Sequence, residues 1–365
     1  MNNIPTLIFD IGSYSIKVGL NNEEKPHQIM SAFPEGNTNF PIYQEIKNDS
    51  KVDFCIQNGE IVNKERLSHI VETIFEEYFP NPDNSERVVF SNTPYSTTKT
   101  INSLLEFAFE LLPVHEVLIK PPAFFSLTPY SQATTLCVDI GHDVTHVVPV
   151  EDGYVISPGI LKTGAAGSAI DLFVTSYRNK NTELHNWGQY CDIREFKQQN
   201  IQVAPKSLHA EISGSTNNDS NCGYVFGELL FNPKLFEAAI PEGQQPSERI
   251  SSLMETDSLQ KLIYNSIQLC DMQNKGALWN RIILTGGSSQ INGLKERLQF
   301  ELEKLCPSGA TPKVTIEKEP TYACWNGAKI YAQYSEPDRW FTRDQYNEDP
   351  SGSHQKFIQY GSLHY

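Results

Sequence analysis

Two acidic residues occupy equivalent places in a repeated tripeptide, Asp-Ile-Gly. The first copy is Asp10-Ile11-Gly12 and the second is Asp139-Ile140-Gly141. A turn of this kind presents backbone N–H groups as a concave nest that suits a phosphate group. A carboxylate beside the nest can hold Mg²⁺ through water, because Mg²⁺ gives up its waters reluctantly. The repeat therefore predicts phosphate and Mg²⁺ binding; since Asp favours turns, a purely structural role is the alternative.

Each copy of the tripeptide lies between two segments with strand patterns. An apolar run precedes each copy, and polar and apolar residues alternate after it, in residues 15–18 and 145–148. Alternation with a period of two is typical of a half-buried strand. Residues 6–20 and 135–150 are therefore predicted to form two β-hairpins. Two such acidic turns indicate two similar halves that face one shared ligand, a nucleotide held between two lobes.

A third glycine element follows a strand late in the chain. The apolar run 281–284 leads into Gly286 and Gly287, and a helix is predicted to begin near Gly293. Glycine lets the backbone approach a ligand closely, because no side chain intervenes. Alone, this pair predicts only a tight turn between strand and helix. Together with the two hairpins it indicates a third contact with the nucleotide.

The rest of the first half alternates between helix and strand patterns. Apolar residues recur at helical spacing over 64–79, and a second helix is predicted over 104–112. Short apolar runs predict strands over 87–90 and 117–119. This alternation indicates an α/β lobe with a mixed sheet.

The second half repeats the theme after its hairpin. Helical sequence begins near Gly167, and an amphipathic helix is predicted over 257–270 with Asp257 as its N-cap. Polar residues, glycine and proline predict loops over 217–221 and 241–251.

Composition places limits on the function. With 365 residues the chain can bury a large core and divide into two lobes. Its net charge of −15 repels phosphate backbones, so strong nucleic-acid binding by this chain is not expected. No apolar run approaches the ~20 residues that cross a bilayer, and no signal peptide is predicted at the N-terminus. Scattered cysteines without a Cys-x-x-Cys pair argue against a disulfide framework or a zinc site; they are Cys55, Cys137, Cys191, Cys222, Cys270, Cys306 and Cys324.

In this order, the two hairpins and the glycine pair resemble the ATPase fold of actin and the sugar kinases, with two phosphate loops and an adenosine loop. Four stretches are similar to actin itself. Residues 143–149 resemble its second phosphate loop and strand, and residues 282–289 its adenosine loop. Residues 322–328 and 340–346 resemble its closing segment. The chain is therefore identified as a divergent member of the actin family.

The resemblance implies an α/β fold with two lobes, a nucleotide cleft between them and a reduced subdomain 2. It also implies the following division of the chain: 1–129 with 323–365 as the first lobe, 33–53 as a shortened subdomain 2, 130–322 as the second lobe and 166–257 as a divergent subdomain 4.

The implied cofactors are ATP or ADP with Mg²⁺. Asp10 and Asp139 would lie near the metal and hold it through water, while Lys17 would reach the β-phosphate as a point charge. Arg194 and Glu195 fall where actin places a Lys-Glu pair around the nucleoside. The remaining implied contacts are backbone amides around the phosphates and residues beside the adenosine: Gly12, Ser13, Tyr14, Gly141, Asp143, Val144, Gly286, Gly287, Thr321 and Tyr322.

Departures from actin bear on catalysis and assembly. Actin positions its attacking water with a glutamine, and counting back from Asp139 without a gap places Pro122 there. His142 stands where actin has an acidic residue in the second loop, and Tyr14 replaces a glycine in the first. The segment between Pro34 and Cys55 is much shorter than actin's DNase-binding loop region. Weak or absent hydrolysis and no self-assembly into long filaments are therefore expected.

Three functions remain open. The first is a non-catalytic structural subunit of a nuclear chromatin-remodelling or histone-modifying complex, because the closing segment and the second loop resemble nuclear actin-related proteins. Its partners would be other subunits, among them actin or another actin-related protein and a helical segment of a remodeller ATPase. The second is a cytoplasmic, cytoskeletal subunit that caps the pointed end of the dynactin filament. The third, a true ATPase such as a polymerising actin or a sugar kinase, is disfavoured by Pro122 and the short segment.

Overall fold

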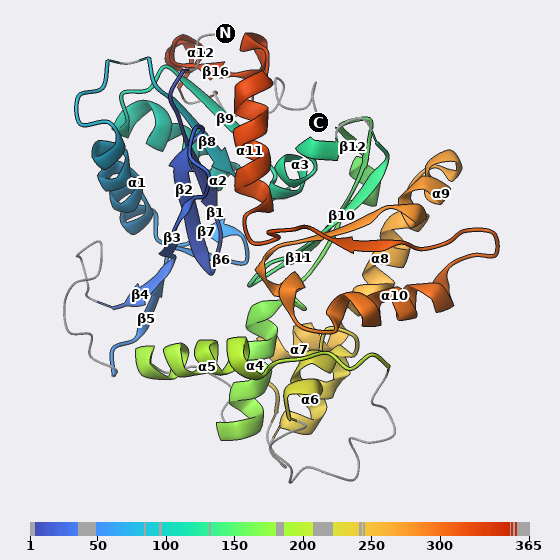
Figure 1. The fold of residues 1–365 in the computed structure, drawn as a ribbon. Coiled ribbons are helices and arrows are strands. Elements are labelled where there is room, and N and C mark those ends of the chain that lie inside the picture. Colours follow the sequence, from blue (N-terminus) through green and yellow to red (C-terminus); the bar gives the residue numbers. More distant parts are fainter. Residues whose placement is uncertain are drawn as a thin grey trace.

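The computed structural model describes residues 4–35, 49–83, 85–94, 97–130, 133–179, 186–206, 222–240, 243, 245–350, 352 and 355. Within them the chain forms two lobes, each built on a mixed β-sheet with helices packed against it (Figure 1). The actin-like two-lobed α/β fold that the sequence implies is thus confirmed. The predicted lobe boundaries stay predictions.

The first sheet belongs to the N-terminal lobe and has the strand order β16-β9-β8-β1-β2-β3. Strand β1 pairs antiparallel with β2 and parallel with β8, so the first predicted hairpin is confirmed. The strands are β1 (Thr6–Ile11), β2 (Ser15–Leu20), β3 (His27–Met30), β8 (Arg87–Ser91), β9 (Glu116–Lys120) and β16 (Phe341–Thr342).

The second sheet repeats this arrangement, with the order β12-β11-β10-β14-β15 and with β13 also paired to β11. Strand β10 pairs antiparallel with β11 and parallel with β14, as β1 does with β2 and β8. The second predicted hairpin is therefore confirmed as well. The strands are β10 (Thr135–Ile140), β11 (Thr145–Glu151), β12 (Tyr154–Val155), β13 (Leu161–Thr163), β14 (Ile282–Thr285) and β15 (Val314–Ile316).

Helices of the first lobe cover both faces of its sheet. Helix α1 buries the face predicted from its spacing, which includes Leu67, Ile70 and Ile74, and Asn63 caps its N-terminus. The predicted helix 104–112 begins earlier, because Thr97 provides an N-cap, and it ends in a π-helical turn. The helices are α1 (Lys64–Tyr78), α2 (Thr98–Glu106), the π-helix η1 (Phe107–Leu111), α3 (Pro122–Ser126), η2 (Thr128–Tyr130), α11 (Ala323–Tyr334), η7 (Pro337–Arg339) and α12 (Arg343–Glu348).

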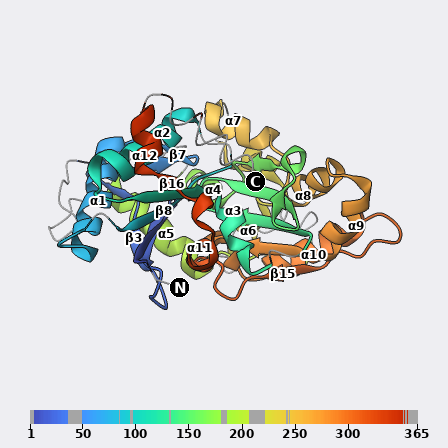
Figure 2. The ribbon, with the colours of Figure 1, turned by 90° about the horizontal axis from the view of Figure 1, so that it is seen from above.

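Helices α3 and α11 lie between the two sheets. Helix α11 packs on β1 and on α3, and α3 packs on β10. Figure 2 shows this pair in the middle, with α1 on one side and α8 to α10 on the other. The helices approach so closely that a Cβ at Gly327 would lie 1.7 Å from the Phe125 carbonyl oxygen. The cleft between the lobes therefore has a rigid, tightly packed base.

Helices of the second lobe enclose the larger apolar core, which includes Phe173, Phe226 and Trp279. In the predicted helix at 257–270 the N-cap position is Ser258, without a side-chain capping hydrogen bond, and the Asp257 carboxylate instead accepts a hydrogen bond from Asn265. The helices are α4 (Gly167–Asn179), α5 (Trp187–Asn200), α6 (Cys222–Glu228), α7 (Glu248–Glu255), α8 (Leu259–Gln268), α9 (Met272–Asn280), α10 (Leu294–Leu305) and the 3₁₀ turns η3 (Ser157–Gly159), η5 (Pro233–Ala239) and η6 (Gly287–Gln290).

Two predicted loops have different outcomes. The prediction of a loop over 241–251 is wrong at its end, because Ser247 accepts a hydrogen bond from the Ile250 amide and starts α7. The predicted loop 217–221 lies outside the described residues.

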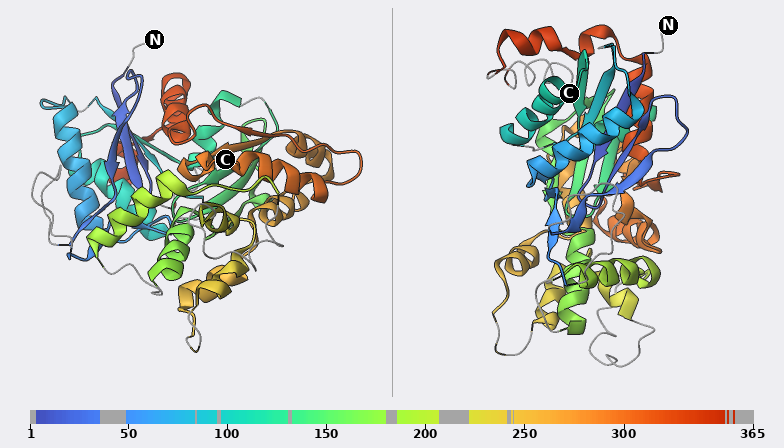
Figure 3. Two further views of the ribbon diagram at one scale, coloured as in Figure 1. Left: turned by 60° about the horizontal axis from the view of Figure 1, so that its bottom comes forward. Right: turned by 90° about the vertical axis from the view of Figure 1, so that its left-hand side faces the viewer.

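Two short hairpins project from the first lobe toward the second. Strands β4 (Ala32–Pro34) and β5 (Val52–Phe54) form an antiparallel ribbon, and β6 (Ile56–Gln57) pairs with β7 (Glu60–Ile61). The left view of Figure 3 shows α5 reaching across toward the β4–β5 ribbon. Of the predicted shortened subdomain 2, residues 36–48 lie outside the described part of the chain.

Candidate nucleotide-binding site

A cavity of about 900 Å³ lies between the lobes, and both Asp-Ile-Gly turns line it. The glycine pair that follows β14 lines it too. The structure thus brings three segments that are far apart in the sequence to one site. The predicted residues along the cavity are Asp10, Gly12, Ser13, Tyr14, Lys17, Asp139, Gly141, Asp143, Val144, Gly286, Gly287, Thr321 and Tyr322.

The first hairpin presents a carboxylate that is already paired. Asp10 lies opposite Lys17 in the β1–β2 register, and the Lys17 Nζ atom is 3.4 Å from Asp10 Oδ2. The Ser91 hydroxyl, at the end of the neighbouring strand β8, donates to Asp10 Oδ1 at 2.8 Å. Ser91 also accepts a hydrogen bond from the Ile11 amide. Asp10 is therefore buried beside one cation and one hydroxyl donor.

The second hairpin presents a carboxylate without such a cation opposite it. Asp139 lies opposite His146 in the β10–β11 register. The Thr285 hydroxyl, from the neighbouring strand β14, donates to Asp139 Oδ1 at 3.4 Å. Burial, with a smaller contribution from the negative charge of Asp10, raises the pKa of Asp139 to about 6. Two carboxylates thus face one cavity, and Lys17 is the cation that pairs with the first of them, Asp10.

Glycine is required where the three segments meet. At Gly286, φ is +81° and ψ is 155°, a region open essentially to glycine alone. A Cβ there would lie 2.4 Å from Asp139 Oδ1 and 2.5 Å from the Ile140 carbonyl oxygen. In the hairpin turns, a Cβ at Gly12 or Gly141 would meet the carbonyl oxygen of Ser15 or Val144 at 3.0 or 2.9 Å. Side chains at these positions would therefore crowd the turns themselves, most severely at Gly286.

The other end of the cavity is built by η6 and the segment before α11. The Gly286 amide donates to the Pro320 carbonyl, which ties the two segments together. The Gln290 side chain donates to the Thr321 hydroxyl. Gly287 is close to Thr321, whose hydroxyl would lie 3.8 Å from a Cβ at that position. Thr321 and Tyr322, which are predicted to lie beside the nucleoside, line the cavity here.

Arg194 and Glu195 do not line the cavity, and their predicted contact with the nucleoside stays a prediction. Helix α5 turns Lys197 and Gln198 toward it instead. Arg194 donates to the Tyr190 hydroxyl, and Glu195 is exposed and accepts from Gln199. The two pairs lie on nearly the same face of α5 but one turn apart along its axis, so the turn that meets the cavity follows the turn that was matched by residue type.

His142, at one of the departures from actin, is buried and neutral. Burial and the nearby positive charges of Lys197, Arg194 and Arg249 hold its pKa well below the usual range. Its ring lies 3.8 Å from carboxylate oxygens of Asp143 and Asp171, measured from Nε2 and Nδ1 respectively. A neutral imidazole adds no positive charge beside a metal, so this replacement is compatible with Mg²⁺ in the cavity.

Two residues line the side of the cavity where actin positions water. Pro122 is the first residue of α3, and its ring carries neither a donor nor an acceptor. His146 is buried, and burial together with Lys162 lowers its pKa to about 4. The imidazole is therefore neutral at physiological pH and is the one polar side chain of this pair.

The donor set fits a nucleotide with Mg²⁺. Two buried carboxylates leave a surplus negative charge that a divalent cation would neutralise, and Mg²⁺ in proteins typically takes one or two carboxylates plus phosphate oxygens and water. Asp10 and Asp139 would hold the ion. The amides of the two turns, with Lys17, would bind the phosphates.

Sequence reasoning missed several residues that shape this site. Ser91 and Thr285 reach the carboxylates from neighbouring strands, and only the strand register reveals them. Gly167 and Ser288 support the second turn: the Gly167 amide and the Ser288 hydroxyl both donate to the Gly141 carbonyl. The sequence shows only that β8 and β14 each end in a polar residue, which does not identify the carboxylate that it meets.

Two lobes with α/β sheets, two acidic glycine turns and a third glycine-bearing loop on one cavity are the arrangement found in a class of nucleotide-binding proteins. The family comparison agrees with the geometry. The actin family model matches residues 1–213 and 213–357, nearly the whole chain. The chain therefore belongs to the actin family.

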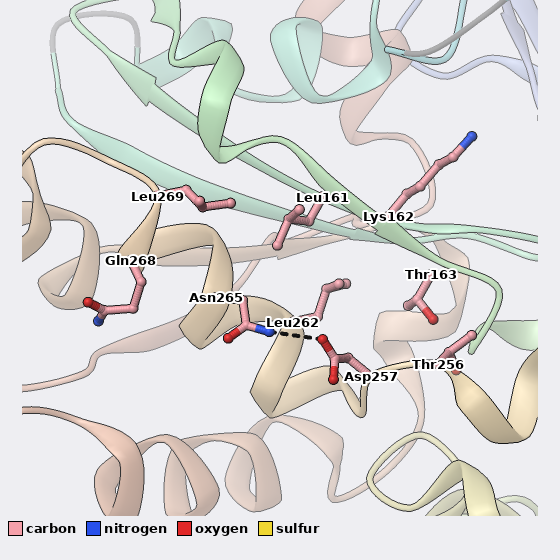
Figure 4. Close-up of a pocket in the computed structure, with 9 residues that line it drawn as sticks. All are labelled: Leu161, Lys162, Thr163, Thr256, Asp257, Leu262, Asn265, Gln268 and Leu269. Carbon is pink, nitrogen blue, oxygen red and sulfur yellow. Dashed lines mark hydrogen bonds between the residues drawn. The ribbon is translucent and has the colours of Figure 1, made fainter.

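A second pocket, of about 530 Å³, lies on the second lobe between β13 and α8 (Figure 4). Leu161, Leu262 and Leu269 are its leucine lining, and Asn265 and Asp257, which a hydrogen bond joins, line it as well. It contains none of the residues predicted to bind nucleotide. Among the described residues, no helix has the length and apolar character needed to cross a membrane.

Proposed function

We propose that this protein is a non-catalytic actin-related subunit of a nuclear chromatin-remodelling or histone-modifying complex, which binds ATP with Mg²⁺ for stability. The observation that carries the nucleotide part is the pair of carboxylates, Asp10 and Asp139, on one cavity lined by two glycine turns. A ligand that binds only the folded state stabilises it by mass action. The nucleotide would therefore act as part of the fold.

Weak hydrolysis follows from the water side of the cavity. General-base or water-orienting catalysis needs a donor or acceptor within hydrogen-bond reach of the attacking water. Pro122 offers none, and its ring fixes the first turn of α3. The neutral His146 alone could accept a proton, but its pKa of about 4 makes it a weak base. Bound Mg²⁺ would supply electrostatic stabilisation of the phosphates, and the missing part is the orientation of water.

The nuclear assignment rests on sequence resemblance. The second loop, residues 139–143, and the closing segment, residues 321–327 and 344–346, are similar to nuclear actin-related proteins. In that setting the partners are other subunits, among them actin or another actin-related protein and a helical segment of a remodeller ATPase. The acidic surface, with net charge −15, leaves DNA contacts to those partners.

A cytoskeletal cap at the pointed end of dynactin is the second candidate. The observation that favours it is the short connection between β4 and β5, whose ends are joined by a hydrogen bond from the Glu35 amide to the Lys51 carbonyl. A terminal subunit needs no extended loop to contact a further subunit.

Hydrolysis is tested by loading the pure protein with Mg·ATP and recovering the nucleotide over hours. The expected result is one nucleotide per chain, recovered as ATP. Pro122→Gln, which restores an amide at the start of α3, should raise phosphate release by about tenfold if water orientation is the missing part. Steady-state phosphate release by the wild type at actin-like rates would contradict the proposal. Co-purification then separates the two settings: histone-exchange ATPases support the nuclear one, and dynactin's actin-like filament supports the other.

A further inference from the structure

Tyr14 makes contacts across the cleft, from the first phosphate loop to the second lobe. Its hydroxyl accepts a hydrogen bond from Gln198 Nε2 on α5 at 2.6 Å. The Arg194 guanidinium lies over its ring, 3.6 Å from the centroid. The His142 ring meets it edge-on, with centroids 5.3 Å apart. A single side chain at the mouth of the cavity therefore joins the first lobe to both α5 and the second phosphate loop.

The β4–β5 ribbon makes a second, apolar contact across the cleft. Ala32 of β4 belongs to one buried cluster with Trp187 and Tyr190 of α5, and all three are at most 4% exposed. The Phe54 ring packs edge-on against Tyr190, with centroids 5.7 Å apart. The Trp187 amide also donates to the Ser50 carbonyl at 2.7 Å. Apolar surface buried here would be exposed to water if the lobes separated.

A third contact lies deeper, where the β6–β7 turn meets the second phosphate loop. The Asn58 amide donates to Asp143 Oδ2 at 2.9 Å. Asn58 has φ of +51°, so its backbone is held in the left-handed region that directs this amide at the carboxylate. Asp143 itself is only 9% exposed.

These three contacts all join residues of the first lobe to the second, and we call them the interlobe latch. Its members are Tyr14 with Arg194 and Gln198, the β4–β5 ribbon with α5, and Asn58 with Asp143. Each of them joins protein groups only. We propose that the interlobe latch holds the cleft closed by itself, and that its opening sets the rate of nucleotide release. The part of this inference that concerns nucleotide release rests on the proposed function. The part that concerns closure does not, because closure by the latch requires no nucleotide.

Tyr14 is the positioning residue of the latch, because it lines the cavity and contacts both α5 and the second phosphate loop. Its removal deletes a hydrogen bond and a stacked guanidinium while leaving the core untouched. Together these interactions are worth about tenfold to a hundredfold in an opening equilibrium. If release requires opening, the dissociation rate should rise by the same factor.

The first experiment measures dissociation of a fluorescent ATP analogue with Mg²⁺ from the full chain. Tyr14→Gly should release it about tenfold or more faster than wild type, and Arg194→Ala should do so in part. Tyr14→Phe keeps the ring and should lie between wild type and Tyr14→Gly. Tyr334→Ala, which removes a tyrosine that is 73% exposed on α11, is the matched control and should not change the rate. Equal rates for wild type and Tyr14→Gly would overturn the latch as the control of release.

The second experiment needs no nucleotide. Hydrogen exchange is followed at the Asn58 and Trp187 amides in nucleotide-free protein and, separately, with Mg·ATP. The latch predicts similar protection in both states for the wild type, and faster exchange at both amides in nucleotide-free Tyr14→Gly. Much faster exchange in the empty wild type than in the loaded one would show that the nucleotide, and not the latch, closes the cleft. Failure to bind any nucleotide would overturn the proposed function, while protection of both amides would still support closure.

Discussion

The two acidic hairpins share a backbone plan but differ in how their carboxylates are neutralised. In each, the Asp lies opposite the residue seven positions later, and a hydroxyl from the neighbouring parallel strand donates to it. In the first hairpin the opposite residue is Lys17, a cation. In the second it is His146, held neutral by burial. The same fold therefore gives one paired carboxylate and one whose charge has no cation opposite it.

The difference between the two hairpins means that the first carboxylate contributes to folding and the second to metal binding. Asp10 is stabilised by the protein itself, through Lys17 and Ser91. Asp139 is destabilised in its charged form, since its pKa is raised to about 6, and it gains when a divalent cation enters the cavity. The second hairpin thus carries most of the penalty that a bound metal would relieve. The predictions below test this asymmetry.

The largest effect is expected where the third loop touches the second hairpin. Gly286→Ala adds a Cβ 2.4 Å from Asp139 Oδ1 in a glycine-only backbone region, which should destabilise the fold by about 4 kcal/mol and abolish nucleotide binding. Gly309→Ala is the matched control: its φ is +92°, but nothing lies within 4 Å of the added atom, so only about 1 kcal/mol of strain is expected. Denaturant unfolding measures both. Equal losses would show that contact with Asp139 is unimportant.

The second prediction concerns the raised pKa of Asp139. Without metal or nucleotide, Asp139→Asn should stabilise the protein at pH 8 by about 3 kcal/mol at most, since it removes a buried charge whose pKa lies about two units above its ordinary value. Because the pKa of Asp139 is higher in the folded state than in the unfolded state, its contribution to the free energy of unfolding is greatest below the unfolded pKa. That contribution is lost as pH rises through about 6. The gain from the substitution should therefore vanish near pH 4. Unfolding curves from pH 4 to pH 8 provide the measurement.

The third prediction follows from His146, whose shift acts in the opposite direction. Its pKa of about 4 lies below the ordinary value of 6.5, so the folded state resists protonation and stability is lost as pH falls from about 6.5 to 4. In the wild type this loss opposes the gain from protonating Asp139. In Asp139→Asn the opposing gain is absent, so the loss caused by His146 should become measurable. The free energy of unfolding should then fall by up to about 3 kcal/mol on acidification. A flat profile in Asp139→Asn would contradict the assignment.

The fourth prediction concerns the first hairpin and has the opposite sign to the second. Asp10→Asn should destabilise the protein by about 2 kcal/mol at pH 8, because it leaves the largely buried Lys17 ammonium without its carboxylate. Lys17→Met in the same background should recover part of the loss, since no buried charge then remains unpaired. Stabilisation by Asp10→Asn comparable to that of Asp139→Asn would remove the proposed asymmetry.

The smallest predicted effect is the loss of unfolding free energy when either of the two hydroxyl donors is removed. Ser91 donates to Asp10 at 2.8 Å and also accepts from the Ile11 amide, whereas Thr285 donates to Asp139 at 3.4 Å. Ser91→Ala should therefore cost about 1.5 kcal/mol of unfolding free energy, and Thr285→Val about 0.5 kcal/mol. Thermal unfolding of the two variants side by side gives the comparison; a larger loss at Thr285 would contradict it.

The sequence made the hairpins predictable because a period of two and a repeated tripeptide are local signals. The neighbours of the carboxylates were not predictable, since Ser91 and Thr285 arrive through parallel pairing with distant strands. The nucleoside side of the cavity was hard to predict for another reason. Arg194 and Glu195 match actin by residue type, but Lys197 and Gln198, one turn further along α5, line the cavity, and tertiary packing such as that of Trp187 and Tyr190 sets where the helix lies along the cleft.

The central claim is that Asp10 and Asp139 serve one metal–nucleotide site. The most direct test is a double-mutant cycle on Mg·ATP affinity, measured by titration calorimetry with wild type, Asp10→Asn, Asp139→Asn and the double variant. We predict one site per chain, weaker binding in each single variant, and a coupling energy of at least about 1 kcal/mol between the two substitutions. Losses that add to within about 0.5 kcal/mol, or an unchanged affinity in Asp139→Asn, would contradict a shared site.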